Sequence, residues 1–193
     1  MGVSLSKGQK ISLKKEGGGA LKKVAMGLGW GKAKVLFGLM SKDVDLDGSC
    51  ILFDGSKKAL DSVWFSKLRS DNGAVVHTGD DLEGGGDPND PNETIHVDLD
   101  GLPADVQSVV FVVNSYSGET FKGIPNAFVN VADLATNKEI ARYSLTLDGG
   151  DYKAFIIAKL SRQVGDWEFQ AIGQPVNGGQ TIKEIMPWAK EHA

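Results

Sequence analysis

The chain has 193 residues, 41% of them hydrophobic, and a net charge of −4 at pH 7. This size predicts one soluble domain with a sizeable core, and the negative charge excludes the global basic field that attracts nucleic acids. The sequence lacks the run of about eighteen apolar residues that a membrane span requires, and its one cysteine and the absence of an apolar leader favour a cytoplasmic protein.

Short strand candidates follow one another along the chain. Apolar side chains alternate with small or polar ones in residues 24–30 and 95–99, as in strands with one buried face, whereas residues 109–113 are continuously apolar, as in a central strand buried on both faces. Further strand candidates are residues 49–53, 127–131, 140–145, 155–160 and 167–171, and turn signals include residues 17–19, 71–73 and 148–150. Only residues 181–191 have a helical pattern, which Pro187 interrupts. About ten short strands predict an all-β fold, a two-sheet β-sandwich with acidic metal-binding loops and few short helices, as a single domain over residues 1–193.

The segment from Asp43 to Asp54 has the acidic spacing of a calcium loop. Acidic residues stand at its first, third, fifth and twelfth positions and Gly48 at its sixth, although an EF-hand has Glu at the twelfth. The apolar run that follows predicts a strand, which argues against a helix–loop–helix. Asp45 and Asp47 would then project from one face of a strand, either as half of a metal site or as a polar turn, and Asp54 is better explained as part of a turn with Gly55.

A second acidic segment spans residues 79–93. It contains no Lys or Arg, and its acidic residues are Asp80, Asp81, Glu83, Asp87, Asp90 and Glu93. Because carboxylates about 6 Å apart repel one another by roughly 0.7 kcal/mol per pair even in water, this glycine-rich segment either extends into solvent as a mobile loop or shares a cation. Oxygen ligands without the Cys and His spacing of zinc sites favour calcium. His77, just before the segment, is either a ligand or, as we expect, a hydrogen-bonded histidine at a strand end.

Several collinear motifs resemble the TerD family of tellurium-resistance and stress-response proteins, especially its TerZ-like members. The matching segments are residues 2–8, 26–30, 45–47, 76–80, 97–99, 103–106, 111–118, 126–128 and 139–143. The resemblance implies a single β-sandwich domain that binds calcium through acidic loops and acts in complexes near the inner face of the cytoplasmic membrane. In the acidic loop Asp81 replaces the family's Asn, and residues 88–93 replace its final acidic run, so Asp90 and Glu93 match less well than Asp80 and Asp87.

We therefore predict a non-enzymatic, cytoplasmic, calcium-binding protein of the stress response and tellurium resistance. Calcium would order residues 79–93 and form a surface for a protein partner. The expected partners are proteins, including those of a membrane-associated complex, and we expect no binding to nucleic acid. The candidate metal ligands are Asp45, Asp47, Asp80, Asp81, Asp87, Asp90 and Glu93. One alternative is a calcium-dependent phospholipid-binding module. Loops that insert into a membrane usually carry apolar or basic tips, and this loop has only one large apolar residue, Leu82, which argues against insertion. The other is a metal-dependent hydrolase with His77 as general base.

Overall fold

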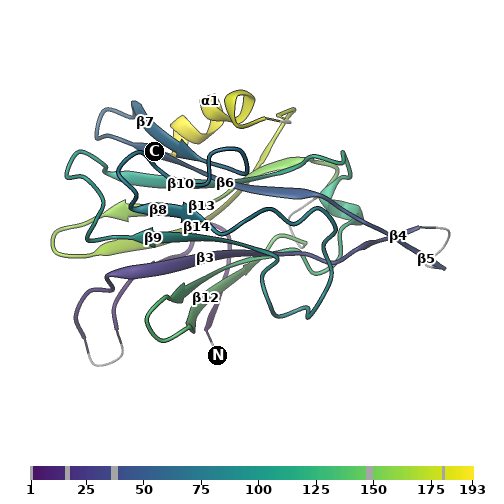
Figure 1. The fold of residues 1–193 in the computed structure, drawn as a ribbon, viewed down its shortest axis with the longest axis horizontal. Coiled ribbons are helices and arrows are strands. Elements are labelled where there is room, and N and C mark those ends of the chain that lie inside the picture. Colours follow the sequence, from purple (N-terminus) through teal and green to yellow (C-terminus); the bar gives the residue numbers. More distant parts are fainter. Residues whose placement is uncertain (1, 16–17, 36–38, 147–149, 180) are drawn as a thin grey trace.

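Two six-stranded β-sheets pack face to face in the computed structural model, which describes residues 2–15, 18–35, 39–146, 150–179 and 181–193 (Figure 1). The first sheet has the order β1 (Val3–Leu5), β12 (Lys138–Ser144), β11 (Phe128–Asp133), β3 (Lys23–Gly29), β9 (Glu93–Asp98) and β8 (Val75–His77). The second has the order β2 (Lys10–Ser12), β14 (Trp167–Val176), β13 (Ala154–Arg162), β10 (Ser108–Ser115), β6 (Leu46–Phe53) and β7 (Ala59–Val63). Within these two sheets neighbouring strands are antiparallel except β1 and β12, which are parallel. The predicted all-β sandwich is confirmed.

Smaller elements lie outside the two sheets. A hairpin of β4 (Ala33–Val35) and β5 (Met40–Lys42) projects from one end of the sandwich (Figure 1). A short 3-10 helix, η2 (Phe121–Gly123), follows β10. Among the described residues, no helix has the length and hydropathy needed to cross a lipid bilayer. Of the predicted turns, Gly17 and residues 148–149 lie outside the described part of the chain.

The predicted C-terminal helix is present as α1 (Ile182–His192), which packs on the second sheet against β6, β10 and β13. Pro187 lies inside this helix instead of ending it. A proline lacks the N–H that would bond to the carbonyl one turn earlier, here that of Lys183. Both Pro187 and Lys183 are exposed, so water can take the place of the missing donor.

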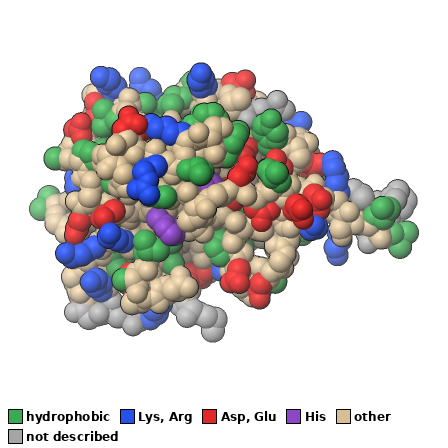
Figure 2. Space-filling view, viewed as in Figure 1, with side chains coloured by type: hydrophobic (Ala, Val, Ile, Leu, Met, Phe, Trp, Pro, Cys, Tyr) green, Lys and Arg blue, Asp and Glu red, His purple; other side chains and the backbone are tan. Residues whose placement is uncertain are grey.

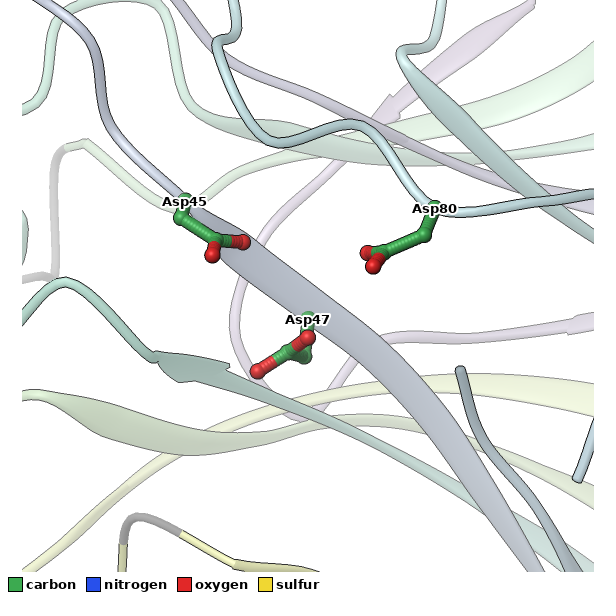
Figure 3. A group of neighbouring side chains, drawn as sticks. All are labelled: Asp45, Asp47 and Asp80. Atoms are coloured by element: carbon green, nitrogen blue, oxygen red, sulfur yellow. The ribbon is translucent and has the colours of Figure 1, made fainter. Parts of the chain in front are cut away.

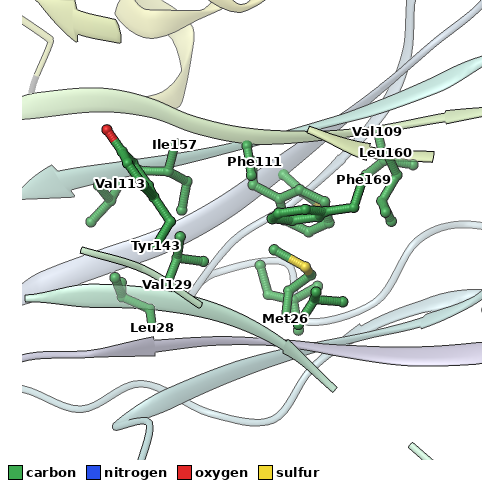
Figure 4. Packing of buried hydrophobic residues seen from close by; sticks show 14 of the residues in the cluster. Met26, Leu28, Val109, Phe111, Val113, Val129, Tyr143, Ile157, Leu160 and Phe169 are labelled. Carbon is green, nitrogen blue, oxygen red and sulfur yellow. The ribbon is translucent and has the colours of Figure 1, made fainter. Parts of the chain in front are cut away.

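The central strand β10 is buried on both faces, as its continuous apolar run predicts. Phe111 and Val113 point into the core between the sheets, which Figure 4 shows, whereas Val110 and Val112 belong to a second apolar cluster together with residues of α1. The neighbouring strand β6 alternates in the same way, with Cys50 in the first cluster and Ile51 in the second. Because β6 and β10 are buried on both faces, side chains at the ends of these strands are attached to a rigid part of the sheet.

Strand β6 begins at Leu46, three residues before the predicted start. The hairpin strand β5 precedes it, and most of the segment from Asp43 to Asp54 is strand β6 itself, so strands and not helices flank and form the calcium-like spacing. The prediction that it is not an EF-hand is confirmed. After β6 the chain turns at Asp54, whose Oδ1 accepts hydrogen bonds from the N–H groups of Ser56 (2.8 Å) and Lys58 (2.9 Å). Asp54 thus stabilises a turn at the far end of the strand from Asp45.

Candidate metal centre

Three carboxylates from two separate acidic segments converge at one end of the sandwich. Asp45 immediately precedes β6, Asp47 is the second residue of that strand, and Asp80 lies in the loop after β8 (Figure 3). One oxygen from each residue lies within 4.8 Å of the other two. Oxygens that surround one Ca²⁺ at 2.3–2.6 Å are separated by up to about 5 Å. The spacing of the three side chains therefore suits a single hard cation.

These carboxylates are poorly compensated by the protein. Asp47 is only 4% exposed, and burial, followed by the nearby charge of Asp45, raises its pKa to about 7. The pKa of Asp45 is raised as well, first by burial and then by the charges of Asp80 and Asp81. The Oδ1 atom of Asp45 is buried and has no hydrogen-bond partner among the described residues. A buried, unpaired carboxylate oxygen is costly, and a cation would satisfy it.

The turn after β10 fixes the backbone of the site. The N–H of Asp45 donates to Oγ of Ser117 (3.0 Å), and the carbonyl of Asp45 accepts from the N–H of Tyr116 (2.9 Å). Asn114 lies opposite Asp47 in the β6–β10 register and donates from Nδ2 to Oδ2 of Asp47 (2.8 Å). Sequence reasoning missed the supporting roles of Asn114 and Ser117. The available signal was a polar pair, Asn114 and Ser115, at the end of an otherwise apolar strand.

Asp81 does not belong to this group, although it follows Asp80 directly. Its Oδ1 accepts hydrogen bonds from the N–H groups of Glu83 (2.9 Å) and Gly84 (2.8 Å), and its Oδ2 accepts from Nδ2 of Asn92 (3.2 Å). Burial alone would raise the pKa of Asp81, but these hydrogen bonds outweigh it and lower the pKa below its ordinary value. The side chain therefore ties the two ends of the acidic loop together.

Asp87 and Asp90 lie elsewhere on the loop. Both line a small pocket beside Trp30 and Phe128, and Oδ1 of Asp87 accepts a hydrogen bond from the N–H of Asn89 (2.8 Å). The structure does not bring either residue into the group of Asp45, Asp47 and Asp80. Together with Asp81, they account for three of the predicted ligands that lie outside the cluster.

Glu93 is the first residue of β9, and its side chain is 1% exposed. Burial raises its pKa, opposed by hydrogen bonds from His77 and from the N–H of Gly48. Glu93 therefore also lies outside the cluster of three, on the inner side of the sheet. His77 ends β8 and is hydrogen-bonded at both ring nitrogens, to Gly48 and Gly79, which confirms the expected strand-end histidine. A buried ring with both nitrogens engaged does not fit the general base that the hydrolase alternative requires.

Further acidic side chains surround the site, and some of them form ion pairs with a lysine. Figure 2 shows Asp and Glu side chains gathered toward the end from which the hairpin projects. Carboxylate oxygens of Asp43 and Glu83 lie 2.7 and 3.5 Å from Nζ of Lys32, so the lysine compensates these two residues and not the cluster. The cluster offers only carboxylate oxygens, with no Cys or His among the described residues that form it. This donor set fits Ca²⁺ or another hard cation and does not fit zinc.

Comparison with known proteins identifies the family to which the chain is similar. A family model described as the TerD domain matches residues 1–186. The chain is 45% identical to tellurium resistance protein TerZ of Serratia marcescens, over 95% of this chain and 94% of that protein, and 39% identical to general stress protein 16U of Bacillus subtilis, over 93% of each. A crystal structure of a telluride resistance protein homologue from Streptomyces coelicolor aligns with a TM-score of 0.69 at 21% identity, covering 86% of this chain and 98% of that one. That likeness supports the fold.

Proposed function

Because this chain belongs to the TerD family, whose members include proteins named for tellurium resistance and general stress, we propose that it is a calcium-binding protein of the stress response and tellurium resistance. It acts as a single domain that binds partners and does not catalyse a reaction. Its place of action is the cytoplasm, where its partners are proteins, including those of a membrane-associated complex.

The observation that carries the proposal is the convergence of Asp45, Asp47 and Asp80 around an unpaired buried oxygen. Three carboxylates at this separation repel one another, and the pKa of Asp47 is raised first by burial and then by the charge of Asp45. A bound Ca²⁺ supplies the opposite charge and takes up the unpaired oxygen. Asp45, Asp47 and Asp80 are the residues that hold it.

Binding would also join two parts of the surface. Asp45 is fixed to the turn after β10 through Ser117 and Tyr116, whereas Asp80 belongs to the acidic loop between β8 and β9. A cation shared by both sides orders the loop against that turn and removes the repulsion between them. The surface formed by the ordered acidic loop and the turn after β10 is the one that we propose for a protein partner.

Thermal unfolding in chelator and in millimolar Ca²⁺ tests the calcium site. At a free concentration of one hundred times Kd, one bound ion adds about 2.7 kcal/mol to the free energy of unfolding. Asp45→Asn and Asp80→Asn should each remove most of the shift in Tm. Asp87→Asn is the matched control, since it removes the same charge from the loop but lies outside the cluster, and it should keep the shift. A wild type without a shift, or equal shifts in all three variants, contradicts the proposal.

One observation favours a second candidate, calcium-dependent phospholipid binding. The projecting hairpin carries Leu39 and Met40 with 86% and 56% of their surfaces exposed, and Leu82 of the acidic loop is 61% exposed. The carbonyl of Glu83 in that loop accepts a hydrogen bond from the N–H of Val44, which follows the hairpin, so the apolar and acidic segments adjoin. Co-sedimentation with phosphatidylserine vesicles, with and without Ca²⁺, decides between the candidates. Binding that needs Ca²⁺ and is lost in Leu39→Ser favours the membrane.

A further inference from the structure

The buried carboxylate of Glu93 lies where β6 of one sheet approaches β8 and β9 of the other. Its Oε2 accepts a hydrogen bond from the N–H of Gly48 (2.8 Å) and lies 3.4 Å from Nε2 of His77, while its Oε1 accepts from the N–H of Asp81 (3.2 Å). A carboxylate has about four acceptor positions. Three of them are used by groups of the protein, and the side chain is 1% exposed.

The two backbone donors stand next to two of the cation carboxylates. Gly48 follows Asp47 in β6, and Asp81 follows Asp80 in the acidic loop. The side chain of Glu93 therefore ties the backbone beside Asp47 to the backbone beside Asp80, which come from segments that are distant in the sequence. The neighbouring strand β7 pairs with β6 only from Cys50 to Phe53 and stops short of Gly48, so it leaves this edge of β6 open to the side chain of Glu93.

His77 adds a second tie at the same place. Its Nδ1 accepts a hydrogen bond from the N–H of Gly79 (3.2 Å), so the ring proton is assigned to Nε2, which faces the carbonyl of Gly48 (3.2 Å) and Glu93. The N–H and the carbonyl of Gly48 are thus both hydrogen-bonded to side chains of the opposite sheet, the N–H to Glu93 and the carbonyl to His77. The glycine favours this approach, since a Cβ at residue 48 would lie 3.0 Å from Oε2 of Glu93 and would push the carboxylate away.

We propose that Glu93, supported by His77, is a positioning residue of the cation site that sets the separation of Asp47 and Asp80 and does not itself ligate the ion. This rests on the proposed calcium function. The hydrogen bonds join groups of the protein alone and need no cation, so they hold the ligands close together against their mutual repulsion. Outer-shell groups of this kind orient metal ligands, and their loss weakens metal binding by about 10–100-fold.

Hydrogen exchange of the wild-type protein, followed by NMR at the amides of Gly48 and Asp81, tests the geometry without any substitution. We expect both N–H groups to be protected in chelator and to stay at least as protected after addition of Ca²⁺. If Glu93 instead turned to ligate the ion, one or both donors would lose their acceptor. Faster exchange of either amide on Ca²⁺ binding therefore overturns the proposal, as does the absence of protection in chelator.

The affinity for Ca²⁺, measured by isothermal titration calorimetry, tests the consequence. Glu93→Gln keeps the shape of the side chain but turns an amide NH₂ toward a backbone N–H, so it should weaken binding about tenfold or more and speed exchange at Gly48 or Asp81. Glu83→Gln is the matched control, because Glu83 carries the same charge in the same loop with its side chain 71% exposed. An unchanged affinity in Glu93→Gln overturns the positioning role alone, and a wild type that binds no Ca²⁺ overturns the calcium function and the positioning role together.

Discussion

Asn114 and Asp47 face each other across β10 and β6, and Nδ2 of Asn114 donates a hydrogen bond of 2.8 Å to Oδ2 of Asp47. Within the described cluster of three carboxylates, this amide favours the ionised form of Asp47, against burial and the charge of Asp45. A hydrogen bond of this kind to a carboxylate fixes the orientation of the carboxylate and favours the charged form that binds a cation. The pair therefore connects the strand register directly to the chemistry of the site.

We expect Asn114→Ala to raise the pKa of Asp47 further and to weaken Ca²⁺ binding near neutral pH. The reason is that the substitution removes the hydrogen bond that favours the carboxylate, while burial and the neighbouring charges remain. Calorimetric titration at two pH values measures the effect, which should be larger at the lower pH. Asn130→Ala is the control, since Asn130 is also buried and donates to a carboxylate, that of Glu139, away from the cluster. Equal weakening in both variants would show a general loss of stability and no specific role.

The metal-free protein should become less stable as pH rises through the range in which Asp47 ionises. Its pKa of about 7 in the folded state exceeds the ordinary 3.8. The folded state thus binds the proton more tightly, and the stability gained from this is fully present below about pH 4 and lost by about pH 7, on the order of a few kcal/mol. Thermal melts in chelator across this range measure the trend. If the Tm of the wild type and the Tm of Asp47→Asn depend on pH in the same way, the expectation is contradicted.

Calcium affinity should respond to pH in the opposite direction. Below about pH 7 a proton must leave Asp47 before the cation can bind, so affinity falls by up to about tenfold for each further unit of pH. Titrations of Ca²⁺ at a series of pH values check this, and the number of protons released on binding provides an independent measure. Binding that releases no proton at pH 6 would contradict the expectation.

Asp47→Asn should stabilise the metal-free protein and abolish its response to Ca²⁺. The substitution removes a buried charge that Asp45 repels, while the amide retains the shape and the oxygen that Asn114 can bond. Each kcal/mol gained raises Tm by about 2–4 °C in a domain of this size. Comparison of melts in chelator and in Ca²⁺ gives both effects at once. A variant with lower Tm in chelator than the wild type would contradict the account.

The sequence predicts the frame of this molecule better than the details of its site. The apolar run 109–113 identifies β10 because a strand buried on both faces needs no polar residue. The start of β6 is harder to predict, since Asp is depleted in strands, yet Asp47 lies inside one. What stabilises it there is Asn114 on the neighbouring strand, a contact between residues 67 positions apart in the sequence.

The choice among the acidic residues of the loop depends on hydrogen-bond donors that composition does not reveal. Asp80 and Asp81 are chemically identical neighbours, but the N–H of Gly84 is available only to Asp81. Glu93 is different, because the alternation of Ile95 and Val97 extends back to it and places all three on the inner face of β9. That signal was present in the sequence and would have identified Glu93 as buried.

The position of Trp30 allows a last test of how the acidic loop supports the site. Nε1 of Trp30 donates to the carbonyl of Val44 (2.7 Å), the residue before Asp45, and Gly84 lies against the same indole. A Cβ at residue 84 would be 2.2 Å from Nε1, so Gly84→Ala must displace the ring or the loop. Gly86→Ala is the matched control, since both glycines have positive φ, +67° and +88°, but a Cβ at residue 86 meets nothing within 4 Å.

Both substitutions should cost about 1–2 kcal/mol of backbone strain, and only Gly84→Ala should also weaken Ca²⁺ binding, because it moves the Trp30 contact that holds the chain beside Asp45. The two effects separate in a pair of measurements, Tm in chelator for the strain and calorimetric affinity for the site. Tryptophan fluorescence reports the displacement of the indole directly. If both variants bind Ca²⁺ equally well, the contact of Trp30 with Val44 does not support the position of Asp45, and the turn after β10 is sufficient to hold it.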